Sequence, residues 1–589
     1  MIFNAVSAER SWQWARCFAE ASRALSLVCL LAVLQGCHQE TGPPINSDAP
    51  VLGAVQSIPC EGEDHRFIKS RCGRFYPDKE SPVYISFAVL APQHDGLSEP
   101  LSPIVYFSGG PGEGGNTQQG KLDHWRYWLL DNDIKRPMIL WDSRGNDGAW
   151  GYFECEAYRL WSLNRLRYPA FADDDEDTRI AACLQQWQSM LGDSGFAQFS
   201  ARQNAKDVLA LLRHLGYSHW HLMSTSYGSR VALWLASLAP ESGQSAIFDS
   251  PYSWTMDDRV SHAAVWAQSF SDALAWCQQR ESCHRGDTVD ALFWRAIETL
   301  DAEPAAVRFR LEGYHQTASI DADTFAHLLF ATFYAAHGLL DVEPSAPRLE
   351  PSAPRLEPSA PRLEPSVKQL GPSAKLSEPS AEQVSSGAAP IMAGRLDYLV
   401  PLLRQIIEGD TQLLQRLVAP VLARSYSSFA NPWLYWAAEC NDNKVLSAED
   451  YTQGVATLGA WSRFLAVDMS LKICHMQQFA KQSLAPEATD ANRAIPSVLL
   501  AGEFDPVVSR RDVIALAQSL KPAVMVQKAG VGHGVIAGGH CGDWLPAFWR
   551  SPHAFVSQWH KGVTNQASGS AVGFPEEQSS ACYVVSTER

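Results

Sequence analysis

The sequence predicts an α/β protein in which a mostly parallel sheet is flanked by helices and interrupted by a helical subdomain. Two observations support this fold class. Short apolar runs of strand length alternate with helical stretches over residues 51–251 and again over residues 494–582. Between these regions, apolar residues recur at helical spacing over residues 264–340 and 396–479.

Each strand of the sheet is expected from a short apolar run. Two early segments, residues 67–76 and 83–90, predict leading antiparallel strands. Residues 203–215 and 229–238 predict helices that cover the sheet. The runs predicted to form parallel strands are residues 103–107, 138–141, 220–223, 246–248, 497–501 and 524–526.

Composition excludes several classes of protein. The chain of 589 residues is 46% hydrophobic, which rules out wholesale disorder. There are 48 Lys and Arg residues against 64 Asp and Glu residues, a net charge of −16, whereas a surface that binds nucleic acid needs an excess of cations. No apolar run approaches the roughly 20 residues that cross a bilayer, so no transmembrane helix is expected.

The N-terminus has the pattern of an export signal. Three arginines precede an apolar run at residues 24–34, which ends in Leu-Gln-Gly before Cys37. This ending resembles the bacterial lipoprotein box, so residues 1–36 are predicted to be a signal peptide and Cys37 to be acylated. Residues 37–58 are then a tether, and we expect the protein in the bacterial cell envelope, held to a membrane by lipid on the periplasmic side or at the cell surface.

The cysteine content agrees with export. Of 13 cysteines, two leave with the signal peptide and one carries lipid, so an even number remains, as a disulfide framework requires. Buried free thiols are the alternative. Pairing neighbours along the chain predicts five disulfides: Cys60–Cys72, Cys155–Cys183, Cys277–Cys283, Cys440–Cys474 and Cys541–Cys582.

The helical subdomain is expected to span residues 253–490, inserted between two parts of the α/β core at residues 59–252 and 491–589. Within it, the heptad Glu-Pro-Ser-Ala-Pro-Arg-Leu and its variants fill residues 343–384. A proline in every heptad excludes a continuous helix, because it removes a backbone donor and clashes with the preceding turn. A disordered surface loop is therefore predicted there.

A candidate nucleophile follows the third predicted parallel strand. The segment Ser224-Thr225-Ser226-Tyr227-Gly228 leads directly into a helix, as in a nucleophile elbow, where a tight turn holds the central Ser in a strained conformation. The turn needs small residues on both sides of Ser226, and Ser224 stands where Gly is usual. A Ser-rich turn that caps a helix is the alternative interpretation.

The acid and the base that a serine nucleophile needs follow later strands in the expected order. Asp505 lies in the turn after the fifth parallel strand, with Glu503 as the rival acid. We expect Asp505 to be the acid, because Pro506 defines the turn after it. His533 lies between glycines after the sixth strand and is the predicted base, with His540 as its rival.

Backbone N–H groups are needed to bind the oxyanion of a tetrahedral intermediate. Tyr227, directly after Ser226, is expected to supply one of them. The other is expected from Gly109 or Gly110, because the glycine-rich loop 108–115 follows the first parallel strand and permits close approach to a reacting carbonyl.

No cofactor or metal is expected. The glycine-rich loop also matches Gly-x-Gly-x-x-Gly, with Asp131 at about the spacing of a ribose-binding acid, but the nucleophile, acid and base leave a dinucleotide no role. A zinc cluster at His533, His540 and Cys541 would consume the predicted base.

Together these motifs resemble the proline iminopeptidase and tripeptidyl aminopeptidase family of α/β-hydrolases. The resemblance spans about residues 60–582 and rests on residues 109–114, 140–145, 224–228, 502–507 and 532–534. It implies an α/β-hydrolase fold in which the helical insertion is a cap that excludes water from the active site. Tryptophans expected to line an apolar pocket under this cap are Trp254, Trp266, Trp276, Trp433, Trp436 and Trp461.

The chain departs from the family pattern at three positions, where Ser108 replaces His, Ser143 replaces Gln and Ser224 replaces Gly. None of these changes removes a catalytic group. An exopeptidase also needs a counter-charge for the free amine of its substrate, and the resemblance makes Glu439 and Asp442 candidates. Solvated surface acids are the alternative interpretation of these two residues.

The sequence therefore predicts an exported serine exopeptidase that acts on peptides through an acyl-enzyme and releases N-terminal residues or short peptides. Two alternatives stay open. One is a carboxylesterase or lipase, because the fold and the triad do not select amide over ester. The other is a non-catalytic envelope lipoprotein built on a hydrolase scaffold.

Overall fold

The computed structural model describes most of the chain between residues 53 and 585. Residues 1–52, with Cys37, lie outside the described part, as does the heptad segment 343–384. The described ranges are 53–62, 66–93, 101–168, 176–192, 195–254, 256, 258–311, 313–334, 396–426, 431–476, 494–536, 544–564, 572–573 and 582–585.

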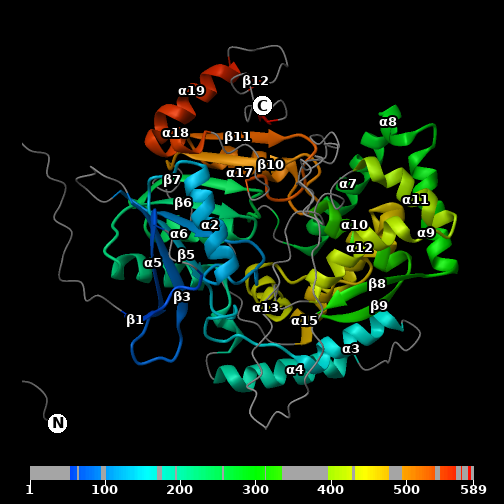
Figure 1. The fold of residues 1–589 in the computed structure, drawn as a ribbon, viewed down its shortest axis with the longest axis horizontal. Coiled ribbons are helices and arrows are strands. Elements are labelled where there is room, and N and C mark those ends of the chain that lie inside the picture. Colours follow the sequence, from blue (N-terminus) through cyan, green and yellow to red (C-terminus); the bar gives the residue numbers. More distant parts are fainter. Residues whose placement is uncertain are drawn as a thin grey trace, which may run out of the picture. The chain divides into compact units, whose positions relative to one another are not determined.

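A twisted sheet forms the centre of the described part (Figure 1). It has 11 strands in the order β1-β2-β3-β5-β4-β6-β7-β10-β11-β13-β12. The six central strands are mutually parallel: β5 (Met138–Asp142), β4 (Ile104–Phe107), β6 (Trp220–Thr225), β7 (Gly243–Asp249), β10 (Ser497–Gly502) and β11 (Ala523–Lys528). Antiparallel strands flank them: β1 (Ala54–Ile58), β2 (Ile68–Tyr76), β3 (Ile85–Pro92), β12 (Val572–Gly573) and β13 (Cys582–Val585).

The predicted fold class is confirmed, including all six parallel strands and the two leading antiparallel strands. Alternation along β4 shows how both faces of the sheet are buried. Val105 and Phe107 pack into one hydrophobic core, whereas Ile104 and Tyr106 point into a second core. The first core is covered by α5 (Ala201–His214), α6 (Gly228–Leu238) and α17 (Arg510–Ser519). The second is covered by α2 (Gln119–Asp131), α18 (Leu545–Arg550) and α19 (Pro552–Thr564).

The helical insertion has a hydrophobic core of its own. Figure 1 shows its helices gathered beside a two-stranded hairpin, β8–β9. The elements around this core, here called the cap, are α7 (Arg259–Gln278), α8 (Glu281–His284), α9 (Val289–Ala302), β8 (Ala305–Leu311), β9 (Tyr314–Ile320), α10 (Ala322–Tyr334), η5 (Leu396–Tyr398), α11 (Leu399–Ile407) and α12 (Gln412–Ser425).

The hairpin corrects the prediction that residues 264–340 are helical throughout. In β8 the buried residues Val307, Phe309 and Leu311 alternate with exposed Arg308 and Arg310, which is the period of a strand. The alternation of apolar and charged residues over residues 307–311 is the sequence pattern that indicates this strand. The helical spacing of apolar residues on both sides obscured it.

Three helices return the chain from the cap to the sheet: α13 (Pro432–Asp442), α14 (Ala448–Ala456) and α15 (Met469–Met476), with the short helix η6 (Gly459–Leu465) between the last two. Helix α13 shares a hydrophobic cluster with residues of α4 (Glu176–Leu191) and η3 (Phe196–Gln198). Helix α3 (Glu156–Arg167) precedes α4.

Four of the five predicted disulfides are confirmed. They are Cys60–Cys72, Cys155–Cys183, Cys277–Cys283 and Cys440–Cys474. The fifth involves Cys541, which lies outside the described residues. Because disulfides persist in oxidising compartments, these four indicate an extracellular or envelope location. Among the helices that the structure describes, none combines the length and apolarity of a membrane span.

The cap tryptophans are packing residues. Trp266 and Trp276 are buried in the cap core, and Trp461 packs against it. The other three pack elsewhere: Trp433 and Trp436 in the cluster around α13, and Trp254 against the sheet core near Trp234. Their side chains thus pack in hydrophobic cores, and the lining of an apolar pocket by these residues stays a prediction.

Candidate functional site

Parallel strands share one direction, so the loops after β4, β6, β10 and β11 meet at the same edge of the sheet. These loops carry the glycine-rich segment, Ser226, Asp505 and His533. The site at this edge is therefore built from segments that lie more than 400 residues apart in the sequence.

Ser226 occupies the sharp turn between β6 and α6. Its backbone φ of +53° lies in the left-handed region, which is strained for a residue with a side chain. Gly228 permits this turn, because a Cβ there would lie 2.2 Å from the carbonyl oxygen of Phe107. Ser224, which replaces the usual glycine, is fully buried and its Oγ lies 3.1 Å from Ser229 Oγ. The substitution is accommodated because this hydroxyl has a partner.

The predicted base and the predicted acid are in direct contact. His533 Nδ1 lies 2.8 Å from Oδ2 and 3.0 Å from Oδ1 of Asp505. Both residues are buried, with exposed fractions of 4% and 6%. Oδ1 of Asp505 also accepts the N–H groups of Val507 and Val508, each at 2.9 Å. The carboxylate is thus fixed by its own turn and directed at the imidazole.

Glu503, the rival acid, has a different contact. Its Oε2 accepts the N–H of Gly530 at 2.8 Å, in the loop between β11 and His533. Glu503 therefore binds the backbone of the loop that carries His533, whereas Asp505 contacts the imidazole ring itself. His540, the rival base, lies outside the described residues.

The end of β7 joins the serine turn to the histidine loop. The N–H of Ser226 donates to the backbone oxygen of Asp249 at 2.9 Å. The carboxylate of the same residue accepts the N–H groups of Val535 at 2.7 Å and Ile536 at 2.8 Å. Asp249 therefore ties the nucleophile candidate and the segment after His533 to one point of the sheet.

The second ring nitrogen of His533 is unengaged. Nε2 is buried and has no hydrogen-bond partner among the described residues, so Ser226 and His533 are not hydrogen-bonded to each other in this structure. A carboxylate at Nδ1 favours the tautomer that carries its proton there. Nε2 then presents the lone pair that a general base needs.

The electrostatic surroundings of His533 raise its pKa. Burial disfavours the imidazolium and acts to lower the pKa, but the Asp505 carboxylate opposes it by charge and by hydrogen bonding. Asp249 and Glu113 add negative charge, and the pKa is raised above the usual 6.5. The site therefore stabilises the imidazolium that a proton-transfer step would form.

The glycine-rich loop lies against the serine turn. A Cβ placed on Gly109 would be 3.2 Å from the Cβ of Ser226, so the absence of a side chain lets the backbone approach the nucleophile candidate. The same point is 3.5 Å from Oε2 of Glu113, which places a carboxylate beside the serine. Neither Glu113 nor Asp249 was assigned a role from the sequence, because a single acid in a motif carries no periodic signal.

The cap touches both the acid and the base loops. The ring of Tyr334, at the end of α10, lies with its centroid 4.7 Å from that of His533. Ser269 of α7 donates to the backbone oxygen of Phe504 at 3.1 Å. Trp276 of the same helix packs edge-on against the Phe504 ring. These contacts come from helices distant in sequence, and no motif in the sequence points to Tyr334.

Asp442 and Glu439 are not solvated surface acids. Asp442 is 3% exposed, and its Oδ2 accepts the hydroxyl of Tyr227 at 2.5 Å and the N–H of Ala201 at 2.9 Å. Burial raises the pKa of this carboxyl to about 6, against the lowering effect of the Tyr227 bond. The contact joins α13 to the residue next to Ser226, so Asp442 holds the serine turn.

Glu439 is 2% exposed and already has a cationic partner. Its Oε2 accepts from Arg259 Nη1 at 2.9 Å and from Asn443 Nδ2 at 2.8 Å, whereas Oε1 has no partner among the described residues. Burial raises the pKa of the Glu439 carboxyl, and Arg259 and Arg230 oppose the rise. Arg259 also binds Asp468 through Nε at 2.7 Å, so Glu439 belongs to a buried ionic cluster.

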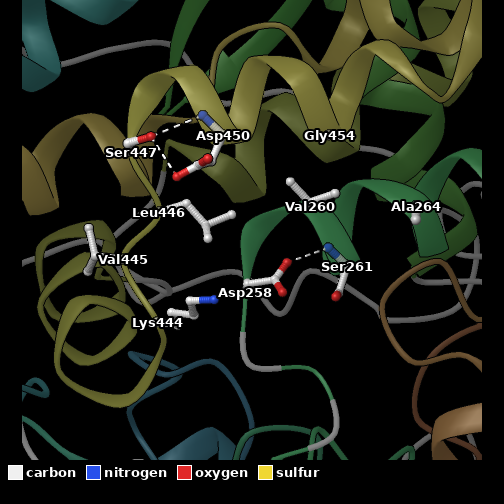
Figure 2. A pocket seen from close by; sticks show the side chains of 10 residues that line it. All are labelled: Asp258, Val260, Ser261, Ala264, Lys444, Val445, Leu446, Ser447, Asp450 and Gly454. Carbon is white, nitrogen blue, oxygen red and sulfur yellow. Dashed lines mark hydrogen bonds between the residues drawn. The ribbon is translucent and has the colours of Figure 1, made fainter.

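One surface pocket of about 570 Å³ lies between the start of α7 and residues 444–454, and its lining does not include Ser226, Asp505 or His533 (Figure 2). Figure 2 shows that two of its polar side chains cap helices: Asp258 accepts the N–H of Ser261 at 2.8 Å, and Ser447 accepts that of Asp450 at 3.0 Å. Among the described residues, no group of three or more His, Cys, Asp or Glu side chains is arranged to hold a metal ion.

Comparison with known proteins finds a family model described as TAP-like protein that matches residues 461–547, a segment that includes Asp505 and His533. A solved proline iminopeptidase from Mycobacterium smegmatis is similar at 11% identity over 87% of this chain and 98% of that chain, with a TM-score of 0.32. An esterase from Thermogutta terrifontis is similar at 11% identity over 83% of this chain and 97% of that chain, with a TM-score of 0.26.

This chain spans less than half of another similar structure, Cfl2 from Burkholderia cenocepacia: the match covers 44% of that chain and 32% of this one, at 15% identity and a TM-score of 0.19. A comparison with curated proteins finds no match. The topology of the sheet and the serine turn after β6 define an α/β-hydrolase fold. With the TAP-like match, they support a hydrolase.

Proposed function

We propose that this protein is an exported serine hydrolase that removes residues from the N-terminus of peptides. The observation that carries the proposal is the buried Asp505–His533 pair, placed at the same sheet edge as the strained turn of Ser226. The TAP-like match supports a peptidase among the hydrolases that share this fold. The catalytic roles below follow from the chemistry of these groups.

In the proposed reaction, Ser226 Oγ attacks the carbonyl carbon of the scissile bond while His533 Nε2 takes its proton. Asp505 holds the imidazole through Nδ1 and stabilises the imidazolium. His533 then protonates the leaving amine, and the acyl group stays on Ser226. A water molecule, deprotonated by His533, hydrolyses this acyl-enzyme. Catalytic hydrogen bonds are often long in unliganded enzymes, so Ser226 and His533 are expected to pair when substrate binds.

The oxyanion is proposed to bind backbone N–H groups of Tyr227 and of Gly109 or Gly110. No described backbone carbonyl accepts a hydrogen bond from these three N–H groups. The loop of Gly109 lies against the Ser226 Cβ, where the carbonyl oxygen of an attacked substrate would be. Removing one such donor typically costs about 100- to 1,000-fold in turnover.

Covalent labelling tests the nucleophile. A fluorophosphonate should label the purified wild-type protein and should not label the Ser226→Ala variant. Ser224→Ala is the matched control, since this neighbouring serine is fully buried and bonded to Ser229. Absence of labelling in folded wild-type protein would favour the non-catalytic lipoprotein.

Substrate profiling tests the peptidase. Cleavage of peptide amides that depends on a free N-terminal amine is expected, whereas faster cleavage of short acyl esters with no such dependence would favour a carboxylesterase or lipase. The lipid anchor is a separate proposal that rests on the sequence around Cys37. A Cys37→Ala variant should lose labelling by fatty acid and leave the membrane fraction; retention there would contradict anchoring.

A further inference from the structure

Glu113 is the acidic side chain that the glycine-rich loop presents to the serine turn. Its Oε2 and the Ser226 Cβ are 3.5 Å and 3.2 Å from one point, the Cβ position of Gly109. Their separation therefore cannot exceed the sum of these two distances. A carboxylate this close to the nucleophile candidate lies within reach of the substrate's acyl portion.

The environment of Glu113 differs from that of the other acids near the site. Its side chain is 30% exposed, so a ligand can reach it. Lys121 Nζ binds Oε1 at 3.1 Å, while Oε2 is the oxygen on the side of Gly109. By contrast, Asp442 and Glu439 are at most 3% exposed and bonded to Tyr227 and Arg259.

The charge of Glu113 also acts on groups around the serine turn. Its charge acts on His533 and also on Tyr106, whose hydroxyl lies 3.4 Å from Thr225 Oγ1, next to Ser226. Glu113 is therefore close enough to the proposed base for its charge to affect the imidazole.

We propose that Glu113 binds the free ammonium group of the substrate's N-terminal residue and that the enzyme releases one residue at a time. This inference rests on the peptidase function proposed above and names its specificity. In an aminoacyl group, the amine is separated from the attacked carbonyl carbon by a single Cα. Each further residue in the acyl portion moves the amine away by roughly 3.3–3.6 Å when extended. An ammonium that reaches Glu113 while its acyl carbon reaches Ser226 therefore belongs to a single residue.

The experiment compares three substrates on the full-length protein: alanine p-nitroanilide, N-acetyl-alanine p-nitroanilide and trialanine p-nitroanilide. The variants are Glu113→Gln, Glu113→Asp and, as matched control, Glu61→Gln. Glu61 is an exposed acid whose Oε2 accepts the N–H of Gln119 at the start of α2, outside the site. Fluorophosphonate labelling of each variant reports whether Ser226 is intact.

Wild-type enzyme is expected to prefer alanine p-nitroanilide to both other substrates. Glu113→Gln should lower kcat/KM for that substrate by about 10- to 100-fold, the value of a hydrogen bond to a charged group, and so reduce the preference over the acetylated substrate. Glu113→Asp should retain part of the preference because it keeps the charge. Glu61→Gln should behave as wild type.

A second variant, Lys121→Met, tests the role of Glu113 without replacing Glu113 itself, in case Glu113→Gln does not fold. Lys121→Met removes the cation that competes for the Glu113 carboxylate and should lower KM for the free amine relative to wild type. An unchanged preference in both Glu113→Gln and Lys121→Met, with a free-amine preference in wild type, would overturn the role of Glu113 and leave the peptidase intact. A wild-type preference for trialanine p-nitroanilide would overturn single-residue release. No free-amine preference in wild type would overturn the peptidase function itself, and this inference with it.

Discussion

The buried acids near the serine turn fall into two groups, which differ in whether the group that the acid binds still has an atom free to react. At the sheet edge, Asp505 binds one nitrogen of His533 and the other nitrogen has no described partner. On α13, Asp442 is bonded to Tyr227 and Ala201, and Glu439 to Arg259. All three acids are buried, with exposed fractions of 6% or less, so burial alone does not identify the acid of a catalytic site. The difference lies in whether the acid orients a group that can still react.

The largest expected effect separates Asp505 from Glu503 at the sheet edge. Asp505→Asn should lower kcat by roughly 1,000- to 10,000-fold, because the imidazole loses the carboxylate that sets its tautomer. Glu503→Gln is the control, since it removes a bond to Gly530 but leaves the histidine pair. Steady-state kinetics measure both. Near wild-type turnover in Asp505→Asn, or a larger loss in Glu503→Gln, would mean that the acid is misassigned.

The pH profile of the wild-type enzyme should report the titration of His533. The proposed mechanism needs neutral His533, whose pKa is raised above 6.5, so kcat/KM should rise with pH through an inflection above that value. Removing a neighbouring negative charge lowers this pKa. Glu113→Gln should therefore move the acid limb to lower pH for all substrates, and a shift to higher pH would contradict the assignment.

One of the disulfides, Cys440–Cys474, joins α13 to α15. Replacing Cys440 and Cys474 by serine should lower the free energy of unfolding by about 4 kcal/mol, whereas replacing Cys277 and Cys283 should cost about 2 kcal/mol, since the closed loops span 34 and 6 residues. Chemical denaturation of the two double variants measures the difference. Equal losses would show that loop closure does not govern their contribution.

A smaller effect is expected at the contact between α13 and the serine turn. Tyr227→Phe removes the hydroxyl that donates to Asp442 and leaves this buried carboxylate with a bond fewer. Stability should fall by about 1–3 kcal/mol, and kcat should fall with it because the turn of Ser226 is less firmly held. Tyr76→Phe, at an exposed bond to Gln56, is the control and should cost little. Unchanged kcat in Tyr227→Phe would mean that Asp442 has no positioning role.

The smallest effect is expected in the heptad segment, which lies outside the described residues. Deletion of residues 343–384 should change the free energy of unfolding by about 0.5 kcal/mol or less and leave turnover near wild type, because surface loops tolerate changes in length. Thermal denaturation and peptide hydrolysis measure this. A collapse of either would show that the repeat supports the cap.

The parts of the fold that follow a local pattern were predictable. Runs such as residues 497–501 are apolar over the length of a strand, and the turn at Ser226 is bounded by small residues, so both could be read along the chain. The hairpin β8–β9 was missed because its alternating residues sit inside a long helical pattern. The roles of Glu439 and Asp442 were not predictable, since their partners Arg259 and Tyr227 lie some 180 to 215 residues away.

The parallel strands and the residues proposed as nucleophile and base follow from local patterns, because each depends on neighbours along the chain. The pairing of neighbouring cysteines was an assumption that the structure confirms for four disulfides. Which acid contacts His533, which acids have buried hydrogen-bond partners and which carboxylate lies beside the serine are decided by the tertiary structure. Those outcomes depend on distances between loops that parallel strands bring to one edge of the sheet, and such distances leave no pattern in a single segment.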